Sequence, residues 1–359
     1  MNRQQLLTAL TAVLPAVDTK AGAQDDAGCF RLKGSEVWAS DSRIAVRAPL
    51  GFDSGLDCLA PADRLVKLLR DLTGDELEVE QAEGELKIKA GRSRVSYKLR
   101  DGGGGKLDAV AWPTEALPWT YTADLDKALR LCRFAASRDA SKGPLCGVHV
   151  GPAACTATDS YRIAQHACAG HMASPQRRRR AEGQEAEITT VILPPEIVGV
   201  LDKQQAKPTA WGLVGGTAAF ACGSATVLCQ TLAGDYPAVD QFLLAGSDLP
   251  EAIELPAGLA GALRRHAAQL ADIDDLDKEV AISLDGPRLL ITSTDGVVYS
   301  QEEDMDLAAA AGKVAFRANP LFLADALEMT RQFNYCRATG MLSFSAGPLR
   351  YVTGVEWAG

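Results

Sequence analysis

The chain has no long apolar run, and this absence argues against a helical membrane span. No stretch of its 359 residues approaches the roughly 20 uninterrupted apolar residues that cross a bilayer. The amino terminus has an apolar middle, but Gln4, Gln5, Thr8 and Thr11 give it a polar face. This segment therefore predicts an amphipathic helix rather than a signal peptide.

Recognisable catalytic and cofactor motifs are also missing. The sequence has no Gly-x-Ser-x-Gly elbow and no His-Glu-x-x-His pair. The glycine run at 102–105, followed by Lys106, resembles a phosphate loop, but Leu107 stands where a hydroxyl residue should hold magnesium. We therefore expect a non-catalytic protein that needs no cofactor.

Cysteine is present, but its spacing shows no pairing. Nine scattered cysteines favour free thiols in a reducing compartment over a disulfide framework, so we expect a cytoplasmic protein. Cys155, His166, Cys168 and His171 have the residue types of a zinc site. Their spacing is poor and no second Cys-x-x-Cys pair completes four ligands, so an enzyme built on them is a remote alternative and we expect no metal.

Negative charge exceeds positive charge, with 46 acidic and 37 basic residues and a net charge of −9. Taken alone, this balance argues against a nucleic-acid partner. Basic residues nevertheless recur on the predicted helices, among them Arg64, Lys67, Arg130 and Arg133. A protein that contacts DNA with one surface can carry a basic lining inside an acidic exterior. The distribution of charge, and not the net charge, therefore determines whether DNA can be a partner.

What the chain does contain is one arrangement used three times. Each copy has an amphipathic helix, a β-hairpin turning on an acidic residue, a second helix opened by proline, and alternating strands. The turns at Asp41, Asp159 and Asp295 lie 35, 34 and 36 residues after a leucine near the start of the preceding helix. Such agreement between dissimilar stretches indicates an internal structural repeat.

The repeat predicts an α+β protein of three tandem domains, each with two helices and antiparallel sheets. The expected domains are residues 1–118, 119–249 and 250–359. The middle domain carries an insertion at 173–187 with four consecutive arginines, Arg177 to Arg180. A segment this polar predicts an exposed loop, either merely solvated or making an auxiliary contact to DNA phosphates.

Several segments together carry a more specific pattern. The middle unit reads RFAASRDASKGPLCGVHV, ATDSYRIA, VILPPEIVGVL and GDYPAV; the first reads ASDSRIAV and AGRSRVSYKL; the third reads FRANPLFLADALEM. Through all three units in order, the chain resembles the beta subunit of bacterial DNA polymerase III, the sliding clamp, as a divergent member. The resemblance implies a head-to-tail homodimeric ring of six clamp domains, with helices inside around duplex DNA and sheets outside.

The resemblance also implies three sets of site residues. The DNA-facing side would include Lys20, Arg70, Arg138 and Lys142. The dimer interface would join Arg92, Arg94, Val95 and Tyr97 of one subunit to Glu302, Glu303 and Asp304 of the other. A cleft for partner peptides, between the second and third domains, would be lined by Leu145, Thr158, Tyr161, Arg162, Ile163, Pro237, Phe242, Asn319 and Phe322.

The implied function is that of a processivity factor without a membrane partner. It would bind DNA independently of sequence and tether the polymerase, the clamp loader and other proteins that carry clamp-binding motifs. The family usually ends in a Met-Pro-Met-like tail that floors the cleft, whereas this chain ends GVEWAG. Either Trp357 substitutes for that tail or the cleft accepts a different motif. The alternative function is a clamp-fold regulator or decoy that binds partner peptides without encircling DNA.

Overall fold

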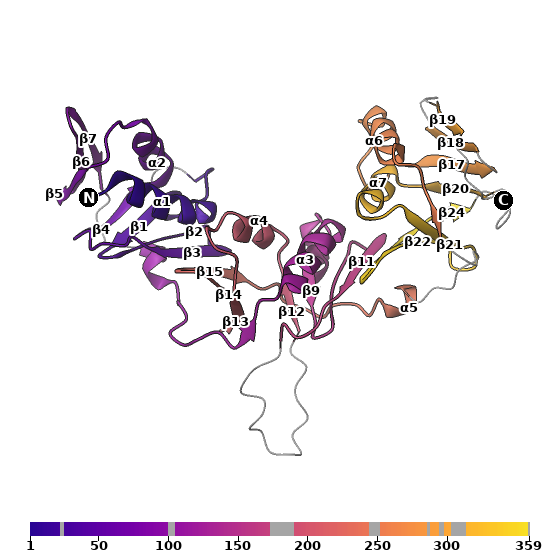
Figure 1. Cartoon of the computed structure of the whole chain (residues 1–359), viewed down its shortest axis with the longest axis horizontal. Coiled ribbons are helices and arrows are strands. Elements are labelled where there is room, and N and C mark those ends of the chain that lie inside the picture. Colours follow the sequence, from indigo (N-terminus) through magenta and orange to yellow (C-terminus); the bar gives the residue numbers. More distant parts are fainter. Residues whose placement is uncertain are drawn as a thin grey trace, which may run out of the picture. The chain divides into compact units, whose positions relative to one another are not determined.

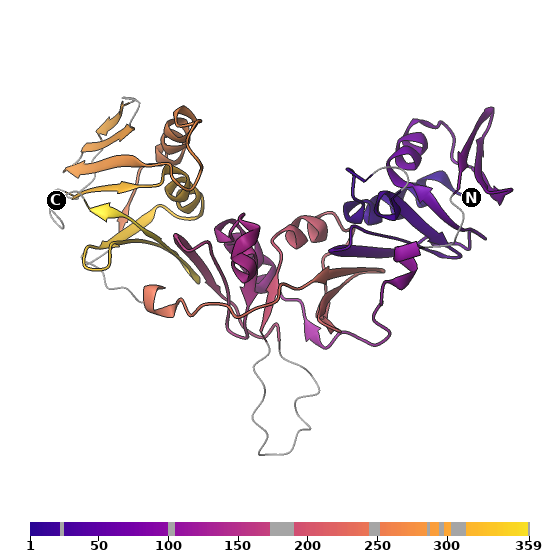
Figure 2. The same ribbon diagram turned by 180° about the vertical axis from the view of Figure 1, so that it is seen from behind.

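The computed structural model describes most of the chain as two compact units (Figures 1 and 2). The described residues are 1–21, 25–99, 105–172, 190–243, 252–285, 288–293, 298–302 and 314–357. Unit 1 comprises 1–122, 170–187 and 196–231, and unit 2 comprises 123–169, 188–195 and 232–359. The turn at Asp295, the arginine run at 177–180, Glu303 and Asp304 lie outside the described residues.

One order of elements, a helix, four strands, a helix and three strands, occurs three times, which confirms the predicted fold class. The first copy contains α1 (Arg3–Val13), β1 (Cys29–Lys33), β2 (Glu36–Ser40), β3 (Ile44–Pro49), β4 (Asp57–Pro61), α2 (Ala62–Asp71), β5 (Glu78–Ala82), β6 (Glu85–Ala90) and β7 (Ser93–Lys98). The second contains α3 (Ala123–Cys132), β9 (Val148–Val150), β10 (Ala154–Thr158), β11 (Arg162–Ala167), β12 (Val191–Leu193), α4 (Glu196–Asp202), β13 (Ala210–Val214), β14 (Thr217–Cys222) and β15 (Ala225–Gln230).

The third copy follows the same order. It contains α6 (Leu259–Gln269), β17 (Val280–Asp285), β18 (Arg288–Ser293), β19 (Val298–Glu302), β20 (Val314–Ala318), α7 (Pro320–Met329), β21 (Gln332–Cys336), β22 (Met341–Ala346) and β23 (Leu349–Gly354). Short elements connect or end the copies: β8 (Trp119–Thr120), α5 (Asp240–Leu243), β16 (Ile253–Glu254) and β24 (Glu356–Trp357). No helix in the described ranges is long and apolar enough to cross a membrane.

Local sequence explains where these helices begin and which face they bury. The Asn2 side chain accepts a hydrogen bond from the Gln5 amide and caps α1, while Asn319 caps α7 by accepting from the amides of Leu321 and Phe322. Pro320 occupies the first position of α7, where its missing N–H costs nothing. In each copy the first helix buries the leucine that marks the repeat; these are Leu6, Leu125 and Leu259.

Each unit contains one eight-stranded sheet that joins two copies of the repeat. The order is β4-β1-β2-β3-β15-β14-β13-β8 in unit 1 and β12-β9-β10-β11-β23-β22-β21-β16 in unit 2. The joints are β3 with β15, where Ala45 pairs with Leu228, and β11 with β23, where Ile163 pairs with Val352. Because the sheets cross the expected boundaries near 118 and 249, the compact units divide the chain differently from the three domains, which stay a prediction.

Two smaller sheets complete the units. Unit 1 has a sheet of order β5-β6-β7, and unit 2 has one of order β19-β18-β17-β20-β24. Within the described residues, β7 and β19 therefore each have one unpaired edge. Helix α1 packs on β2, β3 and α2 in unit 1, and α7 packs on β23 and α6 in unit 2.

Candidate functional site

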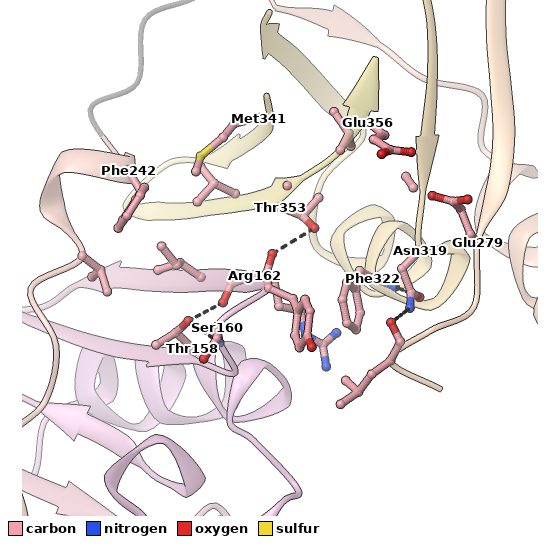
Figure 3. A pocket seen from close by; sticks show the side chains of 18 of the residues that line it. Thr158, Ser160, Arg162, Phe242, Glu279, Asn319, Phe322, Met341, Thr353 and Glu356 are labelled. Carbon is pink, nitrogen blue, oxygen red and sulfur yellow. Dashed lines mark hydrogen bonds between the residues drawn. The ribbon is translucent and has the colours of Figure 1, made fainter. Parts of the chain in front are cut away.

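Unit 2 contains a cavity of about 750 Å³ that is open to solvent (Figure 3). Its walls come from the β10–β11 hairpin, the segment that includes α5, the start of α7 and the end of β23. The structure brings all nine residues of the expected peptide cleft to this one cavity: Leu145, Thr158, Tyr161, Arg162, Ile163, Pro237, Phe242, Asn319 and Phe322.

The hairpin at the cavity is shaped by the acidic turn of the repeat. The Asp159 carboxylate accepts hydrogen bonds from the amides of Tyr161 (3.0 Å) and Arg162 (3.1 Å), which is an Asx turn. Ser160 has φ +83°, a left-handed conformation that the same hairpin of unit 1 repeats at Ser42. The tight turn leaves the Tyr161 side chain 50% exposed at the cavity.

Arg162 holds the hairpin against α7. Its guanidinium donates to Asp159 (2.9 Å), Asp325 (2.7 Å) and the Phe134 carbonyl (2.8 Å), and only 9% of its side chain is exposed. It also lies 4.2 Å from the centre of the Phe322 ring, which permits a cation–π interaction. Five donors in a planar fork suit this multiple role, which lysine could not fill.

The cavity has an apolar side. Ile163, Val239, Leu243 and Val352 form a buried cluster, and Met341 packs against it. Phe242 remains 38% exposed, so an apolar surface is available to an incoming side chain. Such a surface suits the aromatic or aliphatic anchor of a bound peptide.

The opposite side of the cavity is charged, and Figure 3 shows Glu279 and Glu356 there, away from Phe242 and Met341. Arg317 forms an ion pair with Glu279 at 3.4 Å. Trp357 is not among the lining residues; β24 pairs with β20, and the Trp357 ring packs 5.6 Å from Phe316. The interpretation that Trp357 floors the cleft is therefore wrong.

The corresponding surface of unit 1 is covered by its own chain. The pair Ala45 and Leu228 stands where Ile163 and Val352 stand in unit 2. These small and aliphatic side chains cluster with Ala219, and Val110, Trp112 and Leu117 pack over them. A neighbouring cavity of about 490 Å³ has a mixed lining that includes Asp25, Arg43 and Lys106. The two members of the repeat have thus diverged at this surface.

The four residues expected to face DNA fall in both units. Lys20 and Arg70 are exposed in unit 1, and Arg138 is exposed in unit 2. Lys142 is half-buried: its ammonium donates to the Asp159 carbonyl at 2.8 Å and lies 4.9 Å from the centre of the Tyr161 ring. Lys142 therefore also supports the hairpin beside the cavity, whereas contact of the four residues with DNA stays a prediction.

Five of the residues expected at the dimer interface lie in the described part of the chain, on or beside β7 and at the end of β19. Arg92 precedes β7 and is exposed, Arg94 is exposed on β7, and Val95 and Tyr97 of the same strand are half-buried. The Tyr97 hydroxyl donates to the Arg64 carbonyl at 3.2 Å. Glu302 is the last residue of β19.

The cysteines and histidines of the alternative zinc site do not form a metal centre within the described ranges, where no suitable group of three ligands occurs. The sulfurs of Cys155 and Cys168 lie 3.7 Å apart, and both residues are buried. The hydrogen bond to Cys168 and burial raise the pKa of the Cys155 thiol well above its ordinary value. Protonated thiols of this kind are poor metal ligands and poor nucleophiles.

Sequence reasoning missed several residues that shape the cavity. The Tyr236 hydroxyl accepts from the Thr158 amide at 2.9 Å, and its place in GDYPAV could have indicated this role. Asp325 and Met341 carried no signal, because neither a helical carboxylate nor a strand methionine stands out in a sequence. Val239 and Glu356 were likewise overlooked although both line the cavity.

Comparison with known proteins gives a clear structural result. No protein-family model matches the chain, and no curated protein matches it in sequence. Among solved structures, the beta subunit of the Streptococcus pyogenes DNA polymerase matches with a TM-score of 0.78 and 16% identity, over 99% of this chain and 98% of that one. The beta subunit of Pseudomonas aeruginosa DNA polymerase III gives 0.77 and 17%, over 99% and 98%.

A third match is the Helicobacter pylori beta clamp bound to a DNA ligase peptide, with a TM-score of 0.75 and 14% identity over 100% of this chain and 99% of that one. Identities this low establish architecture rather than activity. The whole chain has the fold of the DNA polymerase III beta subunits, the beta sliding clamps.

Proposed function

We propose that the chain is a DNA polymerase processivity factor, a sliding clamp that closes around duplex DNA as a head-to-tail homodimer. One observation carries the proposal: the fold of the beta clamps extends over 99% of the chain, while β7 and β19, whose counterparts in the repeat are joined, each keep an unpaired edge within the described residues. The chain would act without catalysis and without a cofactor.

The internal joints support the mode of closure. The third strand of the four-stranded set pairs with the last strand of the following copy's three-stranded set twice, as β3 with β15 and β11 with β23. By the same rule β19 needs a partner equivalent to β15 and β23, and β7 is that strand. Since β7 belongs to the first copy, a second chain supplies it, and two such contacts close a heterologous dimer into a ring.

Charge at the two edges supports the same pairing. Arg92 and Arg94 lie at the β7 edge, whereas Glu302, Glu303 and Asp304 follow one another at and after the end of β19. Val95 and Tyr97, half-buried on the same strand, would add apolar contact beside the charges. Opposite charge across an interface fixes its register and disfavours wrong pairings.

DNA contact would be electrostatic and independent of sequence. Lys20, Arg70 and Arg138 are exposed cations that could face phosphates, and Lys142 stands near Arg138 in the sequence. Such contacts release counterions and weaken steeply with salt, and they carry no base readout. A ring that holds DNA topologically needs only such weak contacts, because they permit sliding.

The cavity of unit 2 would receive peptides of the polymerase, the clamp loader and other replication or repair proteins. Its exposed aromatic residues, Tyr161 and Phe242, lie over an apolar floor with polar groups at the margin. The Helicobacter pylori beta clamp binds a DNA ligase peptide, which is the kind of ligand that this cavity suits.

Light scattering tests the proposed assembly. A ring requires a dimer of twice the 38.0 kDa chain mass at micromolar concentration. A stable monomer at that concentration would favour the regulator or decoy, because a single chain cannot encircle DNA. A ring stays on circular duplex DNA and is released when the DNA is linearised. A protein bound to the DNA surface is retained equally on both forms.

A further inference from the structure

We propose that the cavity of unit 2 selects peptides in which a basic residue stands next to the apolar anchor. This inference rests on the proposed peptide-binding function and specifies the partner's chemistry. It starts from the contrast within the cavity, where an apolar side at Phe242 and Met341 faces a charged side at Glu279 and Glu356 (Figure 3).

The charged side is more acidic than its ion pairs can balance. The Lys278 ammonium is bonded to Asp275 at 2.5 Å, and the Arg317 guanidinium to Glu279 at 3.4 Å. Arg317 also stands opposite Glu356 in the β20–β24 ladder, but among the residues that the structure describes it forms an ion pair with Glu279 alone. Both cations of this side are therefore already engaged.

Two carboxylates of the charged side take no part in these ion pairs. Asp277 and Glu356 are exposed, line the cavity, and form no ion pair with any residue that the structure describes. The Asn319 amide fixes the segment before Asp277 by donating to the Asp275 carbonyl at 2.7 Å. The acidic side is thus held at the start of α7, and within the described residues the charges of Asp277 and Glu356 are not balanced by an ion pair.

Space for a long side chain is available at the same place. Gly354 lines the cavity beside Glu356, and a Cβ built on it would meet no atom within 4 Å. A lysine or arginine could lay its aliphatic stem along this open backbone and bring its charge to the carboxylates. An acidic residue there would meet like charge, which costs affinity and excludes wrong partners.

Two fluorescein-labelled probe peptides test this inference by anisotropy. The probes are Gly-Lys-Leu-Leu-Phe-Lys-Gly and Gly-Glu-Leu-Leu-Phe-Glu-Gly, which place the charge on both sides of the anchor so that the direction of binding does not matter. We expect the wild-type protein to bind the lysine probe roughly 3-fold to 10-fold more tightly, the size of one or two exposed ion pairs. The difference should shrink at about 0.5 M salt, where screening is strong.

The variant Glu356→Lys should abolish or reverse the preference, whereas the matched control Asp272→Lys should keep it. Asp272 is exposed in unit 2 and does not line the cavity, so Asp272→Lys makes the same change of charge at a position outside the cavity. Equal affinity for both probes, or preference for the glutamate probe, would overturn the inference and leave peptide binding intact. If neither probe bound, both this inference and the proposed peptide-binding function would be refuted.

Discussion

Replacing Arg162 with methionine should destabilise unit 2 far more than an ordinary surface change. Arg162 is 9% exposed and bonded to two carboxylates and a carbonyl, so its loss leaves Asp159 buried without its cation. Breaking a buried ion pair from one side costs about 3–5 kcal/mol. Asp159 keeps two backbone amide donors and Asp325 keeps Arg264 at 3.6 Å, which places the expected cost near the lower limit, about 3 kcal/mol.

Hydrogen exchange followed by mass spectrometry measures this cost within unit 2. A loss of about 3 kcal/mol corresponds to roughly a 100-fold faster exchange of the protected amides of β11 and α7. The matched control is Arg264→Met, which removes an arginine from the same Asp325. Because 44% of the Arg264 side chain is exposed, we expect this variant to cost less than about 1 kcal/mol.

Two results would refute this reasoning. Equal effects of the two variants would mean that the buried position of Arg162 adds no stability. A variant Asp159→Asn/Arg162→Met as unstable as Arg162→Met alone would show that an uncompensated charge on Asp159 is not the source of the cost. We expect the double variant to recover part of the loss, because the neutral amide oxygen can still accept the turn's backbone hydrogen bonds.

Three further predictions concern assembly, pH and salt. Reversing Arg92 and Arg94 to glutamate should raise the dimer dissociation constant at least about 10-fold in analytical ultracentrifugation, since like charges would face each other; an unchanged constant would refute the assigned interface, and the double reversal Lys33→Glu/Lys203→Glu, at exposed residues outside β7, is the charge-matched control. Burial lowers the pKa of His149 below its ordinary value of 6.5. As the pH falls below 6.5, the unfolded chain therefore binds a proton at His149 before the folded chain does. The free energy of unfolding is unaffected above that pH and decreases below it. The urea midpoint should therefore fall less between pH 7.5 and 5.5 in His149→Phe than in wild type, and equal falls would contradict this. Deleting residues 175–183 should reduce the slope of log affinity for DNA against log salt by up to about 4 if the arginines contact phosphates, whereas an identical slope would return the segment to the solvated interpretation.

Most of the fold could be predicted from the sequence because neighbouring residues determine the turns and the helix starts of the repeat. Asp41 and Asp159 form the same turn, with their carboxylates accepting backbone amides, and such turns depend only on neighbouring residues. The prolines at 61, 195 and 320 lie at or immediately before helix starts, as their missing N–H requires. These features need no knowledge of the rest of the chain.

The pairing between copies could not be predicted in this way. Nothing local to Ile163 indicates that it faces Val352, 189 residues later, because strand partners are chosen by packing over long sequence separations. The nine cleft residues were placed by resemblance to a family and not by pattern. Asp325, Met341 and Glu356 were missed because an ordinary helix or strand residue acquires a role at the cavity only once the chain has folded.

The position of Trp357 shows a similar limit. An aromatic residue in place of the family's terminal methionines suggested a substitute floor for the cleft. In the structure, β24 instead extends the sheet at β20, and the Trp357 ring packs against Phe316 and Tyr335. Burial of a large aromatic surface favours this position over the margin of the cavity.

The most direct test of a sliding clamp is its retention on DNA with and without ends. The protein would be loaded by its clamp loader and ATP onto nicked circular duplex DNA, separated from free protein on a sizing column at a salt concentration that dissociates electrostatic complexes, and then treated with a restriction enzyme that cuts the circle once. A ring held by topology remains with the circle and leaves the linear molecule through its free ends. Equal retention on the circular and linear forms would contradict the proposal that this chain encircles DNA.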